Sequence, residues 1–378
     1  MKCGVMLHCV NPSDWERVLA EDWERPPSPA DHQLWDEVIE LGDLIEPSGF
    51  DTIWTVEHFA TPYGMVPSAL QHLTFWAGRT QRIAMGTCVI VLPWHHPIQV
   101  AHEIAMLDIF LQGRDYTIGV GRGLSPKEFG PLGVPQDEAR QRFDEALDII
   151  KLGLSSQRFS YDGKIFQIPE TSIRPQPRHA DLWDRAVGGF MTDTSLEAIA
   201  RAGLGPIVIS PQSFEKVGRD TAKFNAFRAE EGLAPDAQPL VLMWGYCVEK
   251  EEDAQEGYQA FAQHGADGGH HYGFADSKSY SGIKGYEQYS HILSEMGKEQ
   301  QPGKPAPRPA QLIGTPDQII ATVQEMQRVT GAREIAVNFN YGGLPNDKAM
   351  ASLKLFAAEV LPAIHAIQAP PANTSART

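Results

Sequence analysis

The chain has 378 residues, 42% of them apolar, which is enough for one large core or two ordinary ones. Its formal net charge of −16 argues against nucleic acid and anionic membrane surfaces as partners. The four cysteines are scattered singly without a CxxC pair, which favours buried free thiols in a reducing compartment. No signal-peptide pattern precedes the first apolar run, and no apolar run approaches the length of a membrane span. We therefore expect a soluble cytoplasmic protein.

Apolar runs typical of strands alternate with segments of helical spacing along nearly the whole chain. Strands are expected at 3–10, 51–56, 82–92, 116–121, 185–189, 206–210, 239–248 and 334–340. Helices are expected at 31–48, 66–79, 97–109, 137–154, 192–203, 213–231, 251–263, after Thr315, and at 346–366. Right-handed crossovers would close about eight such strands into a TIM-type (β/α)8 barrel, an α/β fold with insertions. An open doubly wound sheet is the alternative.

Two insertions and a tail interrupt this alternation. Residues 158–180 are polar and suit a hairpin. Residues 264–309, before the last helix–strand unit, are rich in glycine and proline and long enough for an active-site lid. The tail 369–378 is small and polar, and we expect it to be disordered beyond a single domain at 1–368. The lid carries aromatic residues, which favour an apolar or ring-bearing substrate: Tyr272, Phe274, Tyr280, Tyr286 and Tyr289.

The stretch Gly49 to His58 carries the clearest chemical signal. It reads as a short buried strand that runs out into a loop at Glu57-His58. In a parallel α/β fold the carboxyl end of a strand faces ligand. Histidine titrates near neutrality and a neighbouring carboxylate raises its pKa, so this pair is a candidate for proton transfer.

Other polar residues fall at predicted strand ends. Arg122 lies in a glycine-flanked loop where the backbone can approach a ligand, although it could equally be a surface arginine. Thr192 and Ser195 begin a helix, whose free N–H groups suit a phosphate, or they simply cap that helix. The remaining candidates of this kind are His8, Tyr246, Asn338 and Asn340.

Several common signatures are absent. The run from Gly119 to Gly123 resembles a dinucleotide loop, but Leu124 stands where the third glycine is needed. His102-Glu103 lacks the second histidine of a zincin motif, and the remaining histidine pairs lack ligand spacing, so no metal site is predicted. The sequence contains neither a GxSxG elbow nor a P-loop.

In combination, several motifs resemble the bacterial luciferase-like flavin-dependent monooxygenase family. They are Gly49 to Phe59, Gly86-Thr87 with Val91-Leu92-Pro93, Gly119 to Leu124, and Gly314-Thr315-Pro316. The resemblance implies a barrel that binds FMNH2, supplied by a separate flavin reductase, as a co-substrate with O2. In that family oxygen adds at the flavin C4a position, and the peroxide oxidises a small organic substrate by hydroxylation, Baeyer–Villiger insertion or aldehyde oxidation. It also implies a homodimer, formed through helices near 96–110.

The resemblance assigns roles to individual residues. It makes His58, after Glu57, the acid/base at the active site. Gly121 occupies the position of the reactive cysteine of luciferase, so that thiol is missing and light emission is not implied. A non-proline cis peptide under the flavin ring is expected near Leu73-Thr74. Residues expected to bind FMN are Gly121, Arg122 and Leu124, together with Leu73 and Thr74, and, at the phosphate-binding helix start, Met191, Thr192 and Ser195.

Two rival functions share the same barrel. One is a deazaflavin-dependent oxidoreductase that transfers hydride without oxygen. The other is a non-catalytic flavin-binding barrel that serves as a store or sensor. Retention of His58 favours an enzyme over a store.

Overall fold

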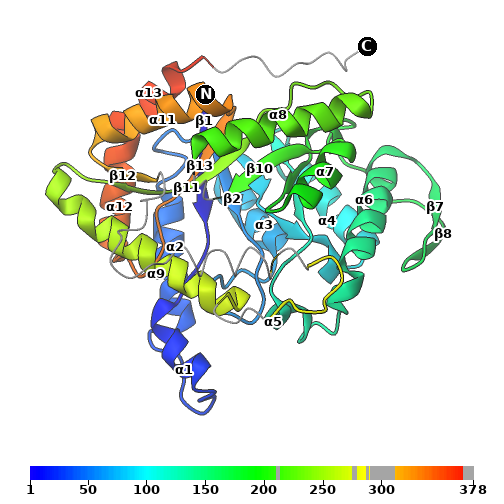
Figure 1. The fold of residues 1–378 in the computed structure, drawn as a ribbon, viewed down its shortest axis with the longest axis horizontal. Helices are drawn as coiled ribbons and strands as arrows, with labels where there is room; N and C mark the ends of the chain where they lie inside the picture. The colour runs from blue at the N-terminus through cyan, green and yellow to red at the C-terminus, as the bar shows by residue number, and fades with distance from the viewer. Residues whose placement is uncertain (210–212, 275–278, 287–288, 290–310, 369–378) are drawn as a thin grey trace.

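The computed structural model describes residues 1–209, 213–274, 279–286, 289 and 311–368 (Figure 1). Its strands are β1 (Lys2–Leu7), β2 (Thr52–Thr55), β3 (Ala84–Thr87), β4 (Ile90–Val91), β5 (Tyr116–Thr117), β6 (Gly119–Gly121), β7 (Phe159–Asp162), β8 (Gln167–Thr171), β9 (Val187–Gly189), β10 (Gly205–Ile209), β11 (Leu240–Cys247), β12 (Leu312–Gly314) and β13 (Glu334–Asn338). The α-helices are α1 (Trp15–Leu19), α2 (Asp31–Asp43), α3 (Ala69–Arg79), α4 (Pro97–Phe110), α5 (Pro126–Phe129), α6 (Ala139–Ser155), α7 (Asp193–Arg201), α8 (Phe214–Glu230), α9 (Ala254–Tyr272), α11 (Pro316–Thr330), α12 (Asn346–Leu355) and α13 (Leu361–Ala366).

The parallel strands form one curled sheet with helices outside it (Figure 1). β1 pairs with β2 on one side and β13 on the other, and the pairing continues through β11, β10, β9 and β6. The run 84–91 links the two ends of this path, because β3 pairs with β2 and β5 while β4 pairs with β6. The predicted α/β barrel is therefore confirmed, and the open doubly wound sheet is wrong.

The core has two layers because successive strand residues point to opposite faces of a barrel sheet. Along β11, Val241 and Met243 pack outward among the helices, whereas Leu242 and Trp244 pack inside the barrel. All eight residues of β11 are buried. This double burial explains why the barrel strands appear in the sequence as continuous apolar runs.

Trp54 fills the barrel interior toward the start of the strands. A Cβ atom on Gly4 or Gly86 would lie 2.6 or 2.3 Å from its indole ring, so only glycine leaves room there. The indole Nε1 donates to a carboxylate oxygen of Glu334, the first residue of β13, at 2.9 Å. The filled interior leaves the opposite, carboxyl end of the strands for ligand.

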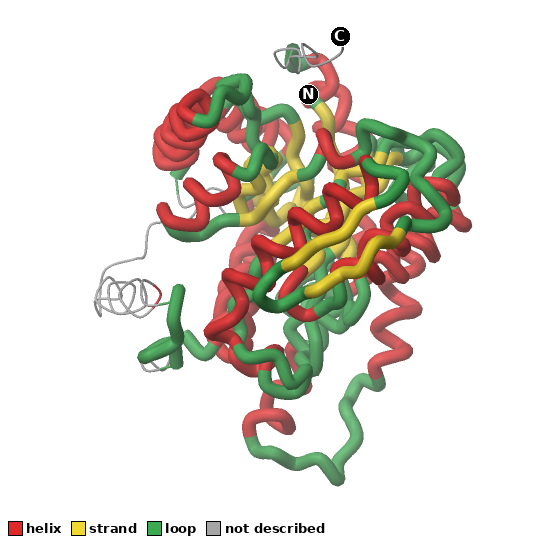
Figure 2. Tube along the Cα trace, turned by 90° about the vertical axis from the view of Figure 1, so that its right-hand side faces the viewer, coloured by secondary structure: helices red, strands yellow, loops and turns green. Residues whose placement is uncertain are grey.

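The structure agrees in part with the insertions predicted from the sequence. The hairpin forms as β7 and β8, which pair antiparallel and lie outside the barrel (Figure 2). Helix α9 passes the predicted end at 263 and continues to Tyr272, where Gly273 adopts a left-handed φ of 70°. Strand β12, beside β11, was not predicted. Much of 264–309 and the tail 369–378 lie outside the described residues, and the single-domain assignment stays a prediction.

The last helical segment corrects one expectation. Asn346–Ala366 is long and apolar enough to cross a membrane by length and composition. However, Leu353, Phe356, Val360 and Ile364 are buried in the core between helices and sheet. The segment is therefore a barrel helix, and its apolar face is explained by packing.

Candidate active site

A cavity lies at the carboxyl ends of the strands, and most of the predicted site residues line it. These are His8, Glu57, His58, Gly121, Arg122, Leu124, Met191, Ser195 and Asn338. They come from loops or strand ends that follow β1, β2, β6, β9 and β13. Thr192 lines an adjoining pocket instead. Asn340 contacts the cavity wall through its backbone, where its carbonyl meets His8 and its N–H donates to Asn338. The Tyr246 hydroxyl donates to Glu256 away from the cavity.

The assignment of Leu73 and Thr74 to the flavin site is wrong. Both lie within helix α3, where Leu73 is packed in the core and the Thr74 hydroxyl donates to the Leu70 carbonyl. The non-proline cis peptide joins Cys88 to Val89, between β3 and β4. These two residues line the cavity, so the feature is present at a different position.

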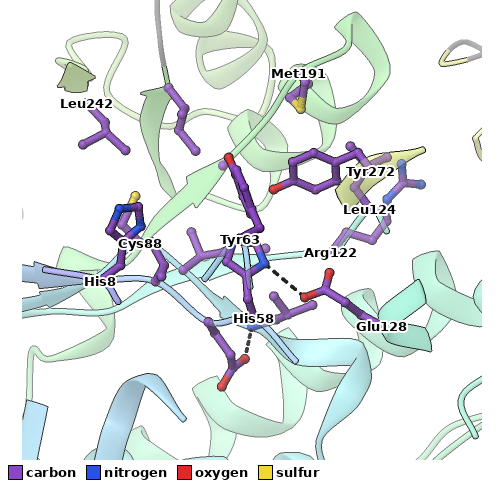
Figure 3. Close-up of a pocket in the computed structure, with 18 of the residues that line it drawn as sticks. His8, His58, Tyr63, Cys88, Arg122, Leu124, Glu128, Met191, Leu242 and Tyr272 are labelled. Carbon is purple, nitrogen blue, oxygen red and sulfur yellow. Dashed lines mark hydrogen bonds and ion pairs between the residues drawn. The ribbon is translucent and has the colours of Figure 1, made fainter. Parts of the chain in front are cut away.

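His58 is held by Glu128 from the short helix α5. Its Nδ1 lies 3.0 Å from Glu128 Oε1, and the Phe59 N–H donates to the same oxygen at 3.0 Å (Figure 3). An ionised carboxylate only accepts hydrogen bonds, so Nδ1 carries the proton of the neutral ring and Nε2 is the free acceptor. No described residue is hydrogen-bonded to Nε2. The imidazole can therefore exchange a proton with a bound group through Nε2.

The electrostatics keep Glu128 ionised. Burial raises its pKa, but the charges and hydrogen bonds of His58 and His271 outweigh that effect and lower the pKa to about 2. His271, from α9, places Nε2 3.3 Å from Glu128 Oε2, and burial lowers the pKa of this histidine. The candidate ligand atoms of His58, Glu128 and His271 lie within 4.8 Å of one another, a set that could also hold a metal ion although the sequence predicted no metal site. The direct contact between His58 and Glu128 already satisfies the carboxylate without one.

Glu57 has a different role from the one predicted. Its Oε2 accepts from the Val91 N–H at 2.7 Å and contacts His95 Nε2 at 3.0 Å. Burial lowers the pKa of His95, but the hydrogen bond and charge of Glu57, together with the charge of Glu103, outweigh it and raise the pKa. Glu57 thus anchors the loop after β4, and the carboxylate that positions His58 is Glu128, which lies 70 residues away in sequence.

His8 stands at another part of the cavity wall, at the end of β1. Its Nε2 lies 3.0 Å from the Asn340 carbonyl and 2.9 Å from the Asn338 amide nitrogen. Burial lowers the pKa of His8 to about 4, and the Asn340 hydrogen bond offsets this only in part. The ring is therefore neutral at pH 7.

Aromatic rings form one wall. Tyr63 stacks on His264 and His271, with ring centroids 5.1 and 4.9 Å apart. His264 also contacts the Trp244 ring at 4.9 Å, and burial lowers its pKa to about 3. This side of the cavity is thus lined by uncharged, flat side chains that suit a planar ligand.

Cationic side chains gather at the other end. Arg122 lines both the cavity and the adjoining pocket, to which Arg140, Thr192, Thr194 and Lys284 also contribute. Figure 3 shows Arg122 and Tyr272 on the side of the cavity opposite His8 and Leu242. Arg122 donates to the Gly285 carbonyl at 2.9 Å. The pocket also contains Asp137, and Arg140 lies 3.5 Å from Asp144, so the cationic side chains exceed the carboxylate of the lining by two. Cationic side chains beside hydroxyl groups are a donor set typical of phosphate binding.

Thr192 and Ser195 cap helix α7, which was the alternative reading of these residues. The Ser195 N–H donates to the Thr192 hydroxyl at 3.2 Å, and the Thr192 N–H donates to the Ser195 hydroxyl at 3.0 Å. Capping does not exclude ligand binding, because Ser195 also lines the cavity. The helix start therefore lies beside the cationic end.

Sequence reasoning missed Glu128, Arg140, His264 and His271. Glu128 follows Ser125-Pro126, a helix-start pattern that could have placed it near the Gly119–Leu124 strand end. His264 and His271 lie seven residues apart on α9, a spacing that puts both on one helix face. The contact between α5 and α9 has no sequence signal, because it joins segments more than a hundred residues apart.

Comparisons with known proteins agree with this geometry. Residues 19–333 match the family model described as luciferase-like monooxygenase. A flavin-dependent trigonelline monooxygenase, oxygenase component, of Acinetobacter baylyi is 29% identical over 228 residues, which are 59% of this chain and 62% of that protein. The chain thus spans less than two thirds of that relative. The alkanal monooxygenase alpha chain of Photobacterium leiognathi is 27% identical, over 89% of this chain and 96% of that protein.

Solved structures show the same fold. A monooxygenase of Streptomyces bottropensis has a TM-score of 0.71 at 24% identity and covers 96% of this chain and 99% of its own. The oxygenating constituent of 3,6-diketocamphane monooxygenase from Pseudomonas putida, in complex with FMN, has a TM-score of 0.71 at 18% identity over 98% of this chain and 99% of its own. An F420-dependent secondary alcohol dehydrogenase has a TM-score of 0.69 at 14% identity over 96% and 98%. By its family match over most of its length, the chain belongs to the luciferase-like monooxygenase family.

Proposed function

We propose that the chain is a flavin-dependent monooxygenase that uses FMNH2 and O2 to oxygenate an apolar or ring-bearing organic substrate, by hydroxylation or Baeyer–Villiger insertion. The observation that carries this proposal is the single cavity that joins a cationic end at Arg122 to an imidazole fixed by a buried carboxylate, His58 with Glu128. FMN has the matching parts, a dianionic phosphate and a flat ring.

The residues present fit this cofactor. Arg122, Arg140 and Lys284 would hold the phosphate, together with the hydroxyl of Thr192 at the start of α7. Gly121 leaves space beside Val89, because a Cβ atom there would lie 2.4 Å from a Val89 methyl group. Leu124 and Met191 supply apolar contacts along the wall. When bound, the reduced flavin supplies the oxygen-activating chemistry.

The side chains of the barrel handle the proton and exclude water. Glu128 fixes the His58 ring through Nδ1, and Nε2 holds or releases the proton that the oxygenation requires. Tyr63 and His271 cover the ring edge, with centroids 5.2 and 5.0 Å away. This enclosure limits the access of water to the reacting group.

Two further parts of the proposal concern partners. The Acinetobacter baylyi relative is the oxygenase component of its monooxygenase, which supports a separate flavin reductase as the source of FMNH2. The exposed apolar side chains Phe75, Met106 and Phe110 lie on the neighbouring helices α3 and α4 and support a homodimer through this surface. A monomer in sedimentation equilibrium at micromolar concentration would contradict the dimer. We also propose a cytoplasmic location.

The test is anaerobic titration with FMNH2 followed by rapid mixing with oxygenated buffer while flavin absorbance is recorded. The wild type should bind FMNH2 and pass through a transient spectrum distinct from reduced and oxidised FMN. His58→Gln should bind FMNH2 with similar affinity and slow the proton-dependent step of the reaction by roughly 10²-fold or more, the usual loss for a general acid or base. His32→Gln, an exposed histidine on α2, is the matched control and should behave as wild type. Binding of F420 but not FMN, or reoxidation identical to that of free FMNH2, would overturn the proposal.

A further inference from the structure

His8 presents a polar atom to the cavity that the proposed flavin chemistry does not use. Its Nε2 is engaged by the Asn340 carbonyl and the Asn338 amide. No described residue is hydrogen-bonded to its Nδ1. This nitrogen is also not one of the fully buried side-chain atoms that lack a hydrogen-bond partner. Because His8 lines the cavity, its Nδ1 is open to a ligand there.

The two partners of Nε2 allow either tautomer of the neutral ring. With a proton on Nε2, the ring donates to the Asn340 carbonyl, and Nδ1 is an acceptor. With Nε2 accepting from the Asn338 amide, Nδ1 carries the proton and is a donor. A hydroxyl group both donates and accepts, so it satisfies Nδ1 in both cases. An ether or carbonyl oxygen satisfies it in only one.

The surroundings of His8 disfavour a charged ligand. Its neighbours in the wall include His264, with ring centroids 6.1 Å apart, and Trp244, which contacts His264. Burial lowers the pKa of both His8 and His264, so neither ring offers a positive charge near pH 7. Among the described lining residues the arginine is Arg122, on the opposite side of the cavity (Figure 3). A carboxylate at the His8 end would be desolvated without a counter-charge, which is costly.

We propose that this end of the cavity binds an uncharged aromatic ring through a ring hydroxyl, with His8 Nδ1 as the hydrogen-bond partner of that hydroxyl. In naming this ring as the substrate class, the inference rests on the proposed monooxygenase function. His8 is then a specificity-determining residue. The aromatic wall supplies contact area for the ring, and the hydrogen bond sets its orientation.

The test is equilibrium binding of three probes to the whole flavin-free protein. Binding is monitored by the quenching of the protein's tryptophan fluorescence. The probes are 2-naphthol, 2-methoxynaphthalene and 2-naphthoate, which share one ring system and differ in the oxygen group. We expect 2-naphthol to bind about tenfold more tightly than the methyl ether, the effect of one net hydrogen bond, and 2-naphthoate to bind most weakly. Equal binding of naphthol and ether, tighter binding of naphthoate, or no binding of naphthol would overturn the inference.

The variant His8→Phe tests whether the preference for naphthol over the ether depends on His8. It should bring the affinity for naphthol to that for the ether while leaving the ether affinity near its wild-type value. A preference for naphthol that survives in a folded His8→Phe protein would overturn the role of His8. If that variant does not fold, the wild-type comparison of naphthol with ether still decides whether a hydroxyl is recognised.

FMN binding, measured separately on the same protein, keeps this inference distinguishable from the proposed function. FMN binding without a hydroxyl preference would overturn the inference and leave the flavin proposal standing. A hydroxyl preference that depends on His8, without binding of FMN in either redox state, would support the ring site and overturn the flavin proposal.

Discussion

Replacing Glu128 with glutamine tests the centre of the site, because this carboxylate is buried and accepts from both His58 and the Phe59 N–H. Its pKa falls from an ordinary 4.5 to about 2 on folding. Each pKa unit corresponds to about 1.4 kcal/mol, so the ionised carboxylate contributes about 3 kcal/mol to the free energy of unfolding at pH 7. The free energy of unfolding of Glu128→Gln should be lower by about that amount, because the amide side chain retains only part of these interactions.

The pH dependence of this loss has a defined sign. Because folding lowers the pKa of Glu128, its contribution is fully present above pH 4.5 and disappears as the pH falls through about 2. Urea unfolding of the wild type and Glu128→Gln at a series of pH values from 7 to 3 should show two curves that converge toward low pH. A constant difference between pH 7 and pH 3, or no difference at pH 7, would refute the assignment of an ionised, paired carboxylate.

Glu145 provides a matched control for the chemical role of Glu128. It is also buried, and backbone N–H groups of Lys164, Ile165 and Phe166 outweigh burial and lower its pKa. It lies on α6 away from the cavity. Glu145→Gln should therefore destabilise the fold but leave the oxygen reaction of bound FMNH2 unchanged, whereas Glu128→Gln should slow the proton-dependent step of that reaction as His58→Gln does. Equal effects of the two variants on the reaction would show that Glu128 has only a structural role.

Two further predictions concern the phosphate end and the barrel wall. Arg122→Ala should weaken FMN binding roughly 10- to 100-fold, the effect of a hydrogen bond to a charged group, and leave riboflavin binding unchanged in fluorescence titrations. Arg158→Ala, at an exposed arginine, is its control, and equal loss for FMN and riboflavin would contradict a phosphate contact. Gly119→Ala should destabilise the fold by about 3 kcal/mol or prevent folding, because its Cβ would lie 1.8 Å from the Thr87 carbonyl. Gly78→Ala, where a Cβ meets no atom within 4 Å, should instead stabilise helix α3 by about 0.5–1 kcal/mol in urea unfolding.

The barrel could be predicted because each of its units is encoded locally. Apolar runs, a helix start such as Thr315-Pro316, and the left-handed Gly331 that ends α11 each act over a few residues. Helix α9 was predicted too short because Gly265, Gly268 and Gly269 lower its intrinsic helix propensity. Packing of buried side chains in its last turns, such as His264 and His271, overrides that propensity.

The site could be predicted only in part, for a related reason. Strand ends collect polar residues, so His8, His58, Arg122 and Asn338 were found from the alternation of elements and the resemblance. The partner of each residue depends on which loops meet above the barrel. Glu57 is adjacent to His58 in sequence, yet successive side chains at the end of a strand point in different directions. The carboxylate that reaches His58 therefore had to come from another loop.

Helix α5 connects the proton-handling group to the segment that covers the cationic end. Its Glu128 holds His58, while Ser125 Oγ and Lys127 Nζ donate to the carbonyls of His271 and His270 at the end of α9, each at 2.8 Å. These bonds satisfy carbonyls that a helix end leaves without partners, so they fix where α9 stops.

Beyond that end, Tyr286 packs its ring against the Arg122 guanidinium, 4.2 Å from the ring centroid, and donates to the Gly123 carbonyl at 2.9 Å. Arg122 is thus held by the same segment that would have to yield it to a phosphate. A phosphate that binds Arg122 would therefore have to compete with the Tyr286 ring and with the Gly285 carbonyl, to which Arg122 donates at 2.9 Å. The described contacts thus connect Glu128 on α5, the end of α9 and Arg122, which lie far apart in the sequence.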